Sequence, residues 1–343
     1  MIASLCLEIE MNREFFQEGN IETIYFGGGT PSLLPVTEVE GLLNSVTRNF
    51  SVSKSPEITF EINPDDAEPA YLEALLKLGI NRLSIGFQSF DDAELRWMNR
   101  GHDAAQNRTA IIAARKSGFS NISVDLIFGS KFQTLGGWKH TLQETIALRP
   151  AHISAYQLTI ENDTVLGRRV HKKQEPIPDS DLCASMFEIL MDEAEVAGYH
   201  QYEISNFSKP GFHSRHNSSY WNNSRYLGIG PSAHSYNGEN RMVNPKSNAL
   251  YMHNVQKGLP IYATENLSPN EKYNEYVLTR LRTSGGCNCG EIEKLFGKEY
   301  REHFETRAAR HGCFVSIHEK TISLTRKGKF FADGIASDLF LIP

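Results

Sequence analysis

Cysteine, tryptophan and long apolar runs are all scarce in this sequence of 343 residues. The cysteines are Cys6, Cys183, Cys287, Cys289 and Cys313. An odd and scattered set of this kind excludes a disulfide framework and indicates a reducing compartment. No run approaches the roughly 18 apolar residues of a membrane span, and no basic stretch leads into an apolar one as in a secretory signal. The sequence therefore predicts a cytoplasmic protein.

A surplus of one charge sign is also missing. The 35 basic and 41 acidic residues leave a net charge of −6 and form no long runs. This excludes the basic surface typical of nucleic-acid-binding proteins, so we expect no nucleic-acid partner. An acidic ligand would have to be met by local basic groups.

The only close cysteine pair is Cys287-Asn288-Cys289. It offers two thiolates, whereas zinc or an iron–sulfur cluster is held by about four ligands. We expect this segment to be a solvent-exposed loop after Gly285-Gly286, with metal binding as the alternative.

Apolar strand-like runs alternate with helical patterns through the first half of the chain. An opening helical pattern ends at Gly19, which supplies a C-terminal stop. Strands spaced by roughly 25–40 residues with helices between them are typical of βα units and predict a parallel sheet. The expected strands are 22–28, 57–64, 82–89, 121–129 and 152–158, and the expected helices are 36–49, 69–78, 91–100, 104–117 and 136–148.

Polar residues occur at or near the ends of these expected strands. The first strand runs into three glycines in TIYFGGGTPSLL, and the later strands carry Glu61, Asn63, Gln88, Asp125 and Gln157. Any one of them could be a cap or a satisfied core group. The carboxyl ends of parallel strands gather on one side of a sheet, where ligands bind. Glu61 and Asp125 interrupt apolar strands, so we expect both to face a ligand or a cation.

The second half of the chain leaves the βα rhythm. A long amphipathic helix after Asp179 leads to the polar, aromatic segment RHNSSYWNNSRYLGIGPSAHSYNG, and helices with a hairpin follow from Ser268. We expect a barrel core with its following segment at 1–235, a linker at 236–267 and a C-terminal helical domain at 268–343. Helices followed by a short hairpin indicate a small winged-helix-like domain.

The ordered motifs GGGTPS, EINPD, RLSIGFQSFDD, RGHD, VDLIFG, YQLTIE, YEISNFSKPG, HNSSYW and GIGPSAHS resemble the radical S-adenosylmethionine (SAM) superfamily. Within it they resemble the HemW branch, which is related to oxygen-independent coproporphyrinogen III oxidase. The resemblance implies an α/β fold: a partial (βα)6 TIM-like barrel, here without its first strand, and a C-terminal helical domain.

The resemblance also implies a SAM site. Backbone groups at Gly28, Gly29 and Thr30 would meet the amino group, because glycine lets a ligand approach the main chain closely. The other implied contacts are Glu61 with the ammonium group, Arg100 with the carboxylate, and Gln88 and Asp125 with the ribose hydroxyls. Arg100 lies at the end of an expected helix, where an Arg can equally be an ordinary C-terminal charge.

Two departures from the family pattern stand out. Members hold a [4Fe–4S] cluster on C-x3-C-x2-C after the first barrel strand, and this chain has no such spacing. We expect a truncation, since a decayed site should have lost some SAM contacts as well; the alternative is a relative without a cluster. As written, the chain should not cleave SAM. The second departure is Gly129-Ser130-Lys131 in place of the usual Gly-Leu-Pro.

The HNSSYW segment matches the H-N-x-x-Y-W signature of HemW. The resemblance implies a heme chaperone that binds heme and SAM and delivers heme to respiratory proteins, which can be membrane-associated. His216, Asn217, Tyr220 and Trp221 are the candidate heme residues, with His234 as the alternative imidazole. A packed structural loop is the competing interpretation. Two other functions stay open: a radical enzyme acting on coproporphyrinogen III, and a non-catalytic barrel that binds heme or a partner. No catalytic residue and no metal ligand is assigned.

Overall fold

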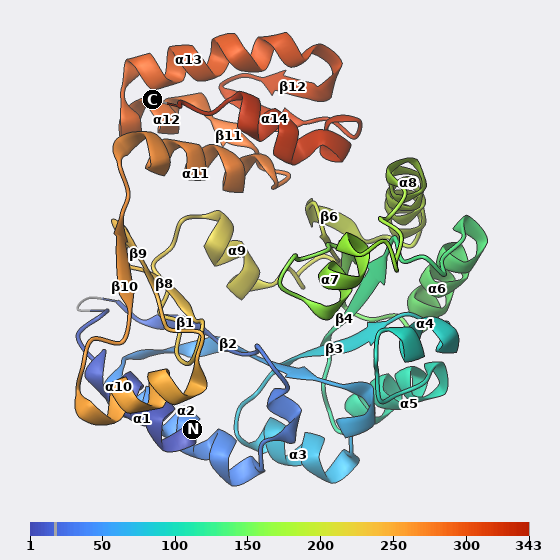
Figure 1. The fold of residues 1–343 in the computed structure, drawn as a ribbon, viewed down its shortest axis with the longest axis vertical. Helices are drawn as coiled ribbons and strands as arrows, with labels where there is room; N and C mark the ends of the chain where they lie inside the picture. Colours follow the sequence, from blue (N-terminus) through green and yellow to red (C-terminus); the bar gives the residue numbers. More distant parts are fainter. Residues whose placement is uncertain (17–18, 343) are drawn as a thin grey trace. The chain divides into compact units, whose positions relative to one another are not determined.

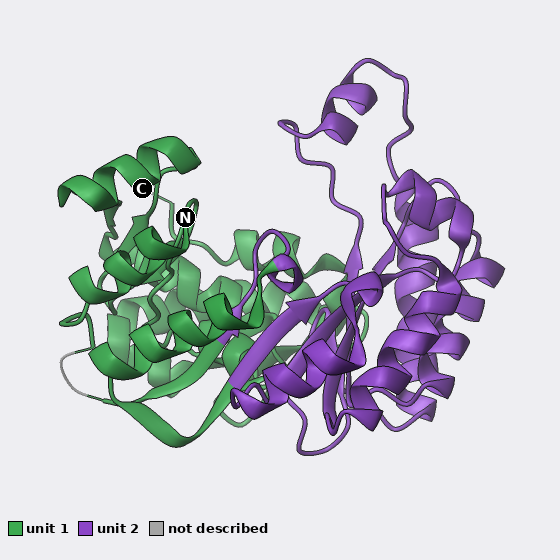
Figure 2. Cartoon of the chain, turned by 90° about the horizontal axis from the view of Figure 1, so that it is seen from below, with its two compact units in different colours: residues 1–24, 34–57, 214–343 green, residues 25–33, 58–213 purple. Residues whose placement is uncertain are grey.

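A computed structural model describes residues 1–16 and 19–342 of the chain. It forms two compact units, shown in Figure 2. Unit 1 comprises residues 1–24, 34–57 and 214–343, and unit 2 comprises residues 25–33 and 58–213. The expected opening helix is shorter than its pattern, because α1 covers Ile2–Met11, and residues 17 and 18 lie outside the described part.

A seven-stranded sheet in the order β1-β2-β3-β4-β5-β7-β6 organises the first two thirds of the chain (Figure 1). Strands β2 to β5 pair in parallel, whereas β7 pairs antiparallel with both β5 and β6. The α/β fold with a parallel sheet is therefore confirmed. The strands are β1 Ile21–Phe26, β2 Val52–Ile62, β3 Arg82–Gln88, β4 Asn121–Phe128, β5 His152–Gln157, β6 His200–Glu203 and β7 Asn206–Ser208.

Helices connect these strands as the periodicity predicts. They are α2 Val36–Asn49, α3 Pro69–Lys77, α4 Asp92–Trp97, α5 Ala104–Lys116, α6 Leu135–Ala147, α7 Val165–His171 and α8 Ser180–Val196, with short 3-10 turns η1 Pro31–Leu33 and η2 Pro64–Asp66. The expected helix 91–100 is wrong at its C-terminal end. It stops at Trp97 because Asn99 adopts a left-handed φ of 58°, which a continuing helix cannot contain.

Buried strands and helices supply the core of unit 2. Leu83, Ile85 and Phe87 share one face of β3 and have no exposed surface, and Arg82, Ser84 and Gln88 on the opposite face are buried as well, as expected for a parallel strand covered on both faces. The indole of Trp138 in α6 is equally buried and donates a 2.8 Å hydrogen bond to the Met186 carbonyl in α8. This bond satisfies the one polar atom of the buried indole.

Unit 1 contains a second, three-stranded sheet and the C-terminal region. The elements are α9 Arg215–Trp221, β8 His234–Tyr236, β9 Asn240–Val243, α10 Asn248–Lys257 and β10 Ala263–Asn266. A buried carboxylate ties α1 to the segments just before β8 and just after β9: Glu8 accepts from the Gly230 amide at 2.8 Å and from the Asn244 side chain at 2.6 Å. Burial raises the pKa of Glu8.

The C-terminal region is helical with a small sheet, as expected. It comprises α11 Pro269–Leu281, β11 Cys287–Asn288, α12 Cys289–Phe296, α13 Lys298–Ala308, η3 Ala309–Phe314, β12 Val315–His318, β13 Thr321–Leu324, η4 Gly328–Phe331 and α14 Ala332–Asp338. The predicted solvent-exposed loop at the cysteine pair is wrong. Cys287 pairs with Ile322 across β11 and β13 and is fully buried, and Cys289 is 4% exposed at the start of α12.

Among the described residues, no helix combines the length and apolar character that crossing a membrane requires.

Candidate functional site

The first candidate site lies in unit 2, around the glycine turn that follows β1. Glu61 of β2 accepts a 2.6 Å hydrogen bond from the Tyr25 hydroxyl and a 3.3 Å bond from the Gly28 amide. A Cβ on Gly27 would lie 2.4 Å from the Tyr25 ring and 2.8 Å from the Glu61 carboxylate. Gly27 is therefore glycine because the carboxylate approaches its backbone, a role that the sequence patterns did not assign to it.

The next two glycines serve the backbone conformation instead. Gly28 and Gly29 have φ values of 74° and 88°, in the region that favours glycine. A Cβ at either position would meet no described atom within 4 Å, so the main chain there is open to an approaching molecule. Thr30 follows on the exposed side.

A second carboxylate, Asp125 of β4, belongs to the same group of residues. It accepts from the Ser84 hydroxyl at 2.9 and 3.1 Å. Burial raises the pKa of Asp125 to about 6, and the negative charge of Glu61 adds to the rise. Two carboxylates that influence one another form a site suited to a positively charged or hydroxyl-bearing ligand.

Arg100 and Gln88 complete the predicted set. Burial lowers the pKa of Arg100, while the negative charges of Asp125 and Asp65 act in the opposite direction. Gln88 ends β3 with a φ of 63° where the register with β4 shifts, and it is 8% exposed. The structure thus brings Arg100 within electrostatic range of Asp125.

Three further residues belong to this cluster and were not predicted, because tyrosines and serines in strands carry no distinguishing pattern. They are Tyr25, Ser84 and Tyr156.

The second candidate site is α9 in unit 1, which contains the HNSSYW segment. Its N-terminal end is held by the buried carboxylate of Glu57, which accepts from the backbone amides of Arg215 and His216 at 3.0 and 2.9 Å. Ser214 caps the same end by accepting from the Asn217 amide at 3.1 Å. A carboxylate at a helix N-terminus satisfies amides that have no partner within the helix. The expected loop conformation of HNSSYW is therefore wrong, because the segment is a capped helix, whereas the competing packing role stays a prediction.

Both ring nitrogens of His216 have hydroxyl partners. Nδ1 lies 2.8 Å from the Thr23 hydroxyl of β1, and Nε2 lies 3.1 Å from the Tyr220 hydroxyl one turn later in α9. Burial lowers the pKa of His216 to about 4, so the imidazole is neutral near pH 7. A neutral imidazole keeps one nitrogen lone pair for an acceptor or ligand role.

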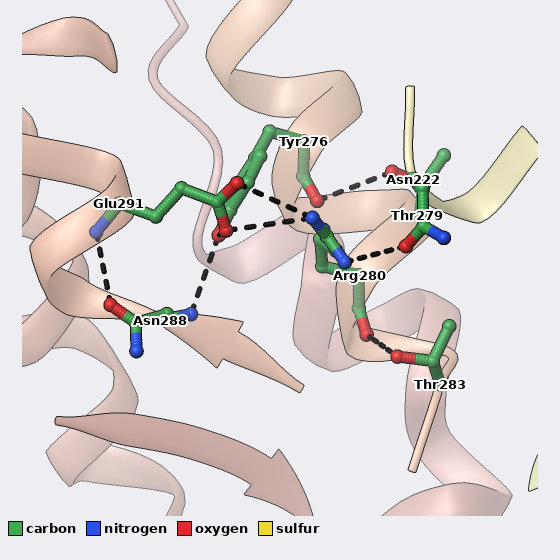
Figure 3. Close-up of polar contacts among 7 residues, drawn as sticks. All are labelled: Asn222, Tyr276, Thr279, Arg280, Thr283, Asn288 and Glu291. Carbon is green, nitrogen blue, oxygen red and sulfur yellow. Dashed lines mark hydrogen bonds and ion pairs between the residues drawn. The ribbon is translucent and has the colours of Figure 1, made fainter. Parts of the chain in front are cut away.

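The C-terminal end of α9 is held by α11 (Figure 3). Arg280 donates at 2.7 Å to the side-chain oxygen of Asn222, the residue that follows α9, and also pairs with Glu291 at 3.3 Å. The guanidinium of Arg282 lies 5.7 Å from the centre of the Trp221 ring. The indole Nε1 of Trp221 and the Nε of Arg280 are buried and have no hydrogen-bond acceptor among the described residues. Buried N–H groups in this state are uncommon and indicate an acceptor supplied from elsewhere.

The remaining candidates of this segment differ in exposure. Asn217 and Trp221 are half-buried, and Tyr220 is 38% exposed. His234, the alternative imidazole, is exposed in β8.

Replacing Glu57 by Gln should lower the free energy of unfolding by about 1–2 kcal/mol, since the helix end loses a charged acceptor for two amides. Urea denaturation monitored by circular dichroism would measure it. Glu22→Gln is the matched control, because Glu22 also contacts Arg215 but is exposed, and an exposed pair contributes at most about 0.5–1 kcal/mol. Equal losses in the two variants would contradict the role of Glu57 as the anchor of α9.

The cysteines of this chain do not suit the [4Fe–4S] cluster that radical SAM proteins hold. Cys183, Cys287 and Cys289 are buried, Cys6 is half-buried in α1 and Cys313 is exposed. Within residues 1–16 and 19–342, no group of three or more His, Cys, Asp or Glu side chains could hold a metal ion.

Known proteins resemble this chain along most of its length. The family model described as the radical SAM superfamily matches residues 8–145, and the one described as the HemN C-terminal domain matches residues 267–331. The heme chaperone HemW of Bacillus subtilis (strain 168) is 34% identical over 335 residues, which cover 96% of this chain and 88% of that protein. Heme chaperone HemW of Mycobacterium tuberculosis (strain ATCC 25618 / H37Rv) is 30% identical over 339 residues, covering 98% and 85%.

A solved structure agrees with the fold. Coproporphyrinogen III oxidase (HemN) from Escherichia coli superposes with a TM-score of 0.84, covering 98% of this chain and 82% of that one. At 22% identity this likeness concerns the fold alone. The identity to the HemW proteins over nearly the whole of both chains goes further: this chain belongs to the HemW family of the radical SAM superfamily.

Proposed function

We propose that this chain is a heme chaperone that binds heme at α9, binds SAM at the strand ends of unit 2, and passes heme to respiratory proteins. The family supports this function, because relatives at 30–34% identity are named heme chaperone HemW. Heme is the cargo of such a protein and not its resident cofactor.

The observation that carries the heme proposal is the fixed position of the HNSSYW helix. Glu57 holds one end of α9 and Arg280 holds the other, so its side chains are presented by a supported element. Supported elements position binding groups more accurately than loops do. His216 and Tyr220 offer groups that ligate heme iron in other proteins, and Trp221 offers an aromatic surface for the macrocycle.

The unsatisfied donors at the C-terminal end of α9 agree with this cargo. Heme carries two carboxylates on a flat apolar ring. The buried N–H groups of Trp221 and Arg280 have no acceptor in the described part of the chain, and the guanidinium of Arg282 lies over the indole. Carboxylates are the strongest acceptors for such donors. This favours an anionic, planar ligand over a neutral one.

SAM would be held by the residues around the glycine turn. We assign the ammonium group to main-chain acceptors at Gly28, Gly29 and Thr30 and to the Glu61 carboxylate, which lies beside this turn and accepts from the Gly28 amide. Arg100 suits the SAM carboxylate. Gln88 and Asp125 suit the ribose hydroxyls, for which they provide an amide and a carboxylate.

A titration with ferric heme tests the proposed function. His216→Ala and Trp221→Ala should each weaken heme binding about tenfold, the first by disturbing ligation and the second by removing stacking surface. The Soret band should shift in His216→Ala and keep its position in Trp221→Ala. Absorbance titrations and thermal melts should be recorded on the same samples.

Trp97→Ala is the control for Trp221→Ala. Both tryptophans are half-buried beside one cation, with Lys131 5.6 Å from the Trp97 ring and Arg282 5.7 Å from the Trp221 ring. Trp97→Ala should lose stability without losing heme. If both α9 variants bind heme like the unmodified chain and only melt earlier, HNSSYW serves packing and the proposal fails.

A further inference from the structure

The hydrogen bond between His216 and Tyr220 determines which of the two can reach a ligand. Nε2 of His216 lies 3.1 Å from the Tyr220 hydroxyl, and the two rings meet edge to face at 5.1 Å. The other imidazole nitrogen lies 2.8 Å from the Thr23 hydroxyl. Any iron approaching Nε2 would therefore have to displace the phenol first.

The phenol is the more accessible partner. Tyr220 is 38% exposed, whereas His216 is half-buried between Thr23 and Tyr220. Tyr226 contacts the Tyr220 ring edge to face at 4.7 Å and supports it from the side. Of the two side chains, Tyr220 therefore presents more surface to an approaching ligand.

We propose that Tyr220 is the axial ligand of the ferric heme iron at α9 and that His216 is its hydrogen-bond partner. This inference rests on the proposed heme-binding function and specifies which atom contacts the iron. Tyrosine ligates heme iron in catalase-type sites, so the chemistry has precedent.

The ligation step balances without a change of oxidation state. The Tyr220 O–H bond breaks, its proton is released to solvent, and the phenolate oxygen forms a bond to ferric iron. The neutral imidazole of His216 then donates from its Nε2–H to the phenolate and accepts from the Thr23 hydroxyl at Nδ1. Thr23 is therefore a positioning residue that selects the tautomer of His216.

Ferric heme titrated into the full chain tests this inference by spectroscopy. The unmodified chain should show a phenolate-to-iron charge-transfer band, with phenolate vibrations enhanced when resonance Raman excitation falls within it. Tyr220→Phe should lose both signatures. Tyr226→Phe should keep them, because it removes a neighbouring hydroxyl but leaves Tyr220 and His216 intact. His216→Ala should keep the band and weaken binding about tenfold, the equivalent of one hydrogen bond to a charged group.

A second variant keeps the test decisive if Tyr220→Phe does not fold. Tyr220→His should bind heme with an imidazole-type spectrum in place of the phenolate one. Reduction of the heme iron should also release heme from the unmodified chain, because phenolate is a weaker ligand for ferrous than for ferric iron. Reduction should release less heme from Tyr220→His.

The outcomes separate this inference from the proposed function. If the unmodified chain binds heme with an imidazole spectrum that Tyr220→Phe preserves, His216 is the ligand and the inference is overturned while heme binding stands. The inference is likewise overturned if every variant keeps the spectrum of the unmodified chain. If the unmodified chain binds no heme, the proposed function itself fails.

Discussion

Asp125→Asn should make the chain more stable above about pH 6 while weakening SAM binding. Burial raises the pKa of Asp125 from 3.8 to about 6, so the folded state holds a proton that the unfolded state releases between these values. The unmodified chain therefore loses stability as the pH rises through this window, and the loss is complete above about 6. The neutral amide of Asn avoids this cost and still accepts from Ser84.

The expected gain is about 2 kcal/mol at pH 8 and close to zero at pH 4. Two pK units would correspond to roughly 3 kcal/mol, and the half-buried position of the side chain reduces this value. Urea denaturation at several pH values would measure it. Asp192→Asn, an exposed position on α8, is the control and should change little at any pH.

SAM affinity should be measured by calorimetry on the same variant at pH 8. We expect a loss of about tenfold, since the charged acceptor for a ribose hydroxyl is removed. If the free energies of unfolding of the unmodified chain and of Asp125→Asn differ by the same amount at every pH from 4 to 8, the carboxyl of Asp125 does not titrate as inferred. Unchanged SAM affinity would remove Asp125 from the ligand set.

Anaerobic reconstitution with ferrous iron and sulfide should leave this chain without a [4Fe–4S] cluster. Cluster ligands are thiolates at suitable spacing. Burial raises the pKa of Cys183 and Cys287, and it raises that of Cys289 to about 11, so these thiols resist ionisation. Cys6 and Cys313 alone cannot complete a ligand set.

Absorbance spectra with iron and sulfide analysis would measure the outcome, and Cys6→Ala and Cys313→Ala should behave like the unmodified chain. A stoichiometric cluster would contradict the expectation. Its loss in Cys6→Ala would then identify Cys6 as a ligand, and its survival would point to the buried thiols.

Local sequence patterns predicted most of the secondary structure of this chain. The expected helix 36–49 coincides with α2, and the strand expected from Arg82 coincides with β3 apart from one residue. Hydrophobic periodicity and caps determine such elements within a few residues. The end of α4 was missed because the left-handed Asn99 has no strong signal, and β2 was missed before Glu57 because Val52–Pro56 is more exposed than its later residues.

The candidate sites could be predicted only in part. Glu61 and Asp125 stand out as carboxylates inside apolar strands, and HNSSYW stands out as a motif. Their partners do not, because a tyrosine in β1 or a serine in β3 is typical of any strand.

The sequence by itself determined the order of the strands and helices, the family and the residues that mark the two sites, since all of these depend on neighbours in the chain. Only the tertiary structure decided what surrounds those residues. Glu57 caps a helix that lies 158 positions later, Thr23 meets an imidazole 193 positions away, and pairing with β13 buries Cys287. Burial and hydrogen-bond partners of this kind arise when distant segments pack together, so no local pattern can specify them.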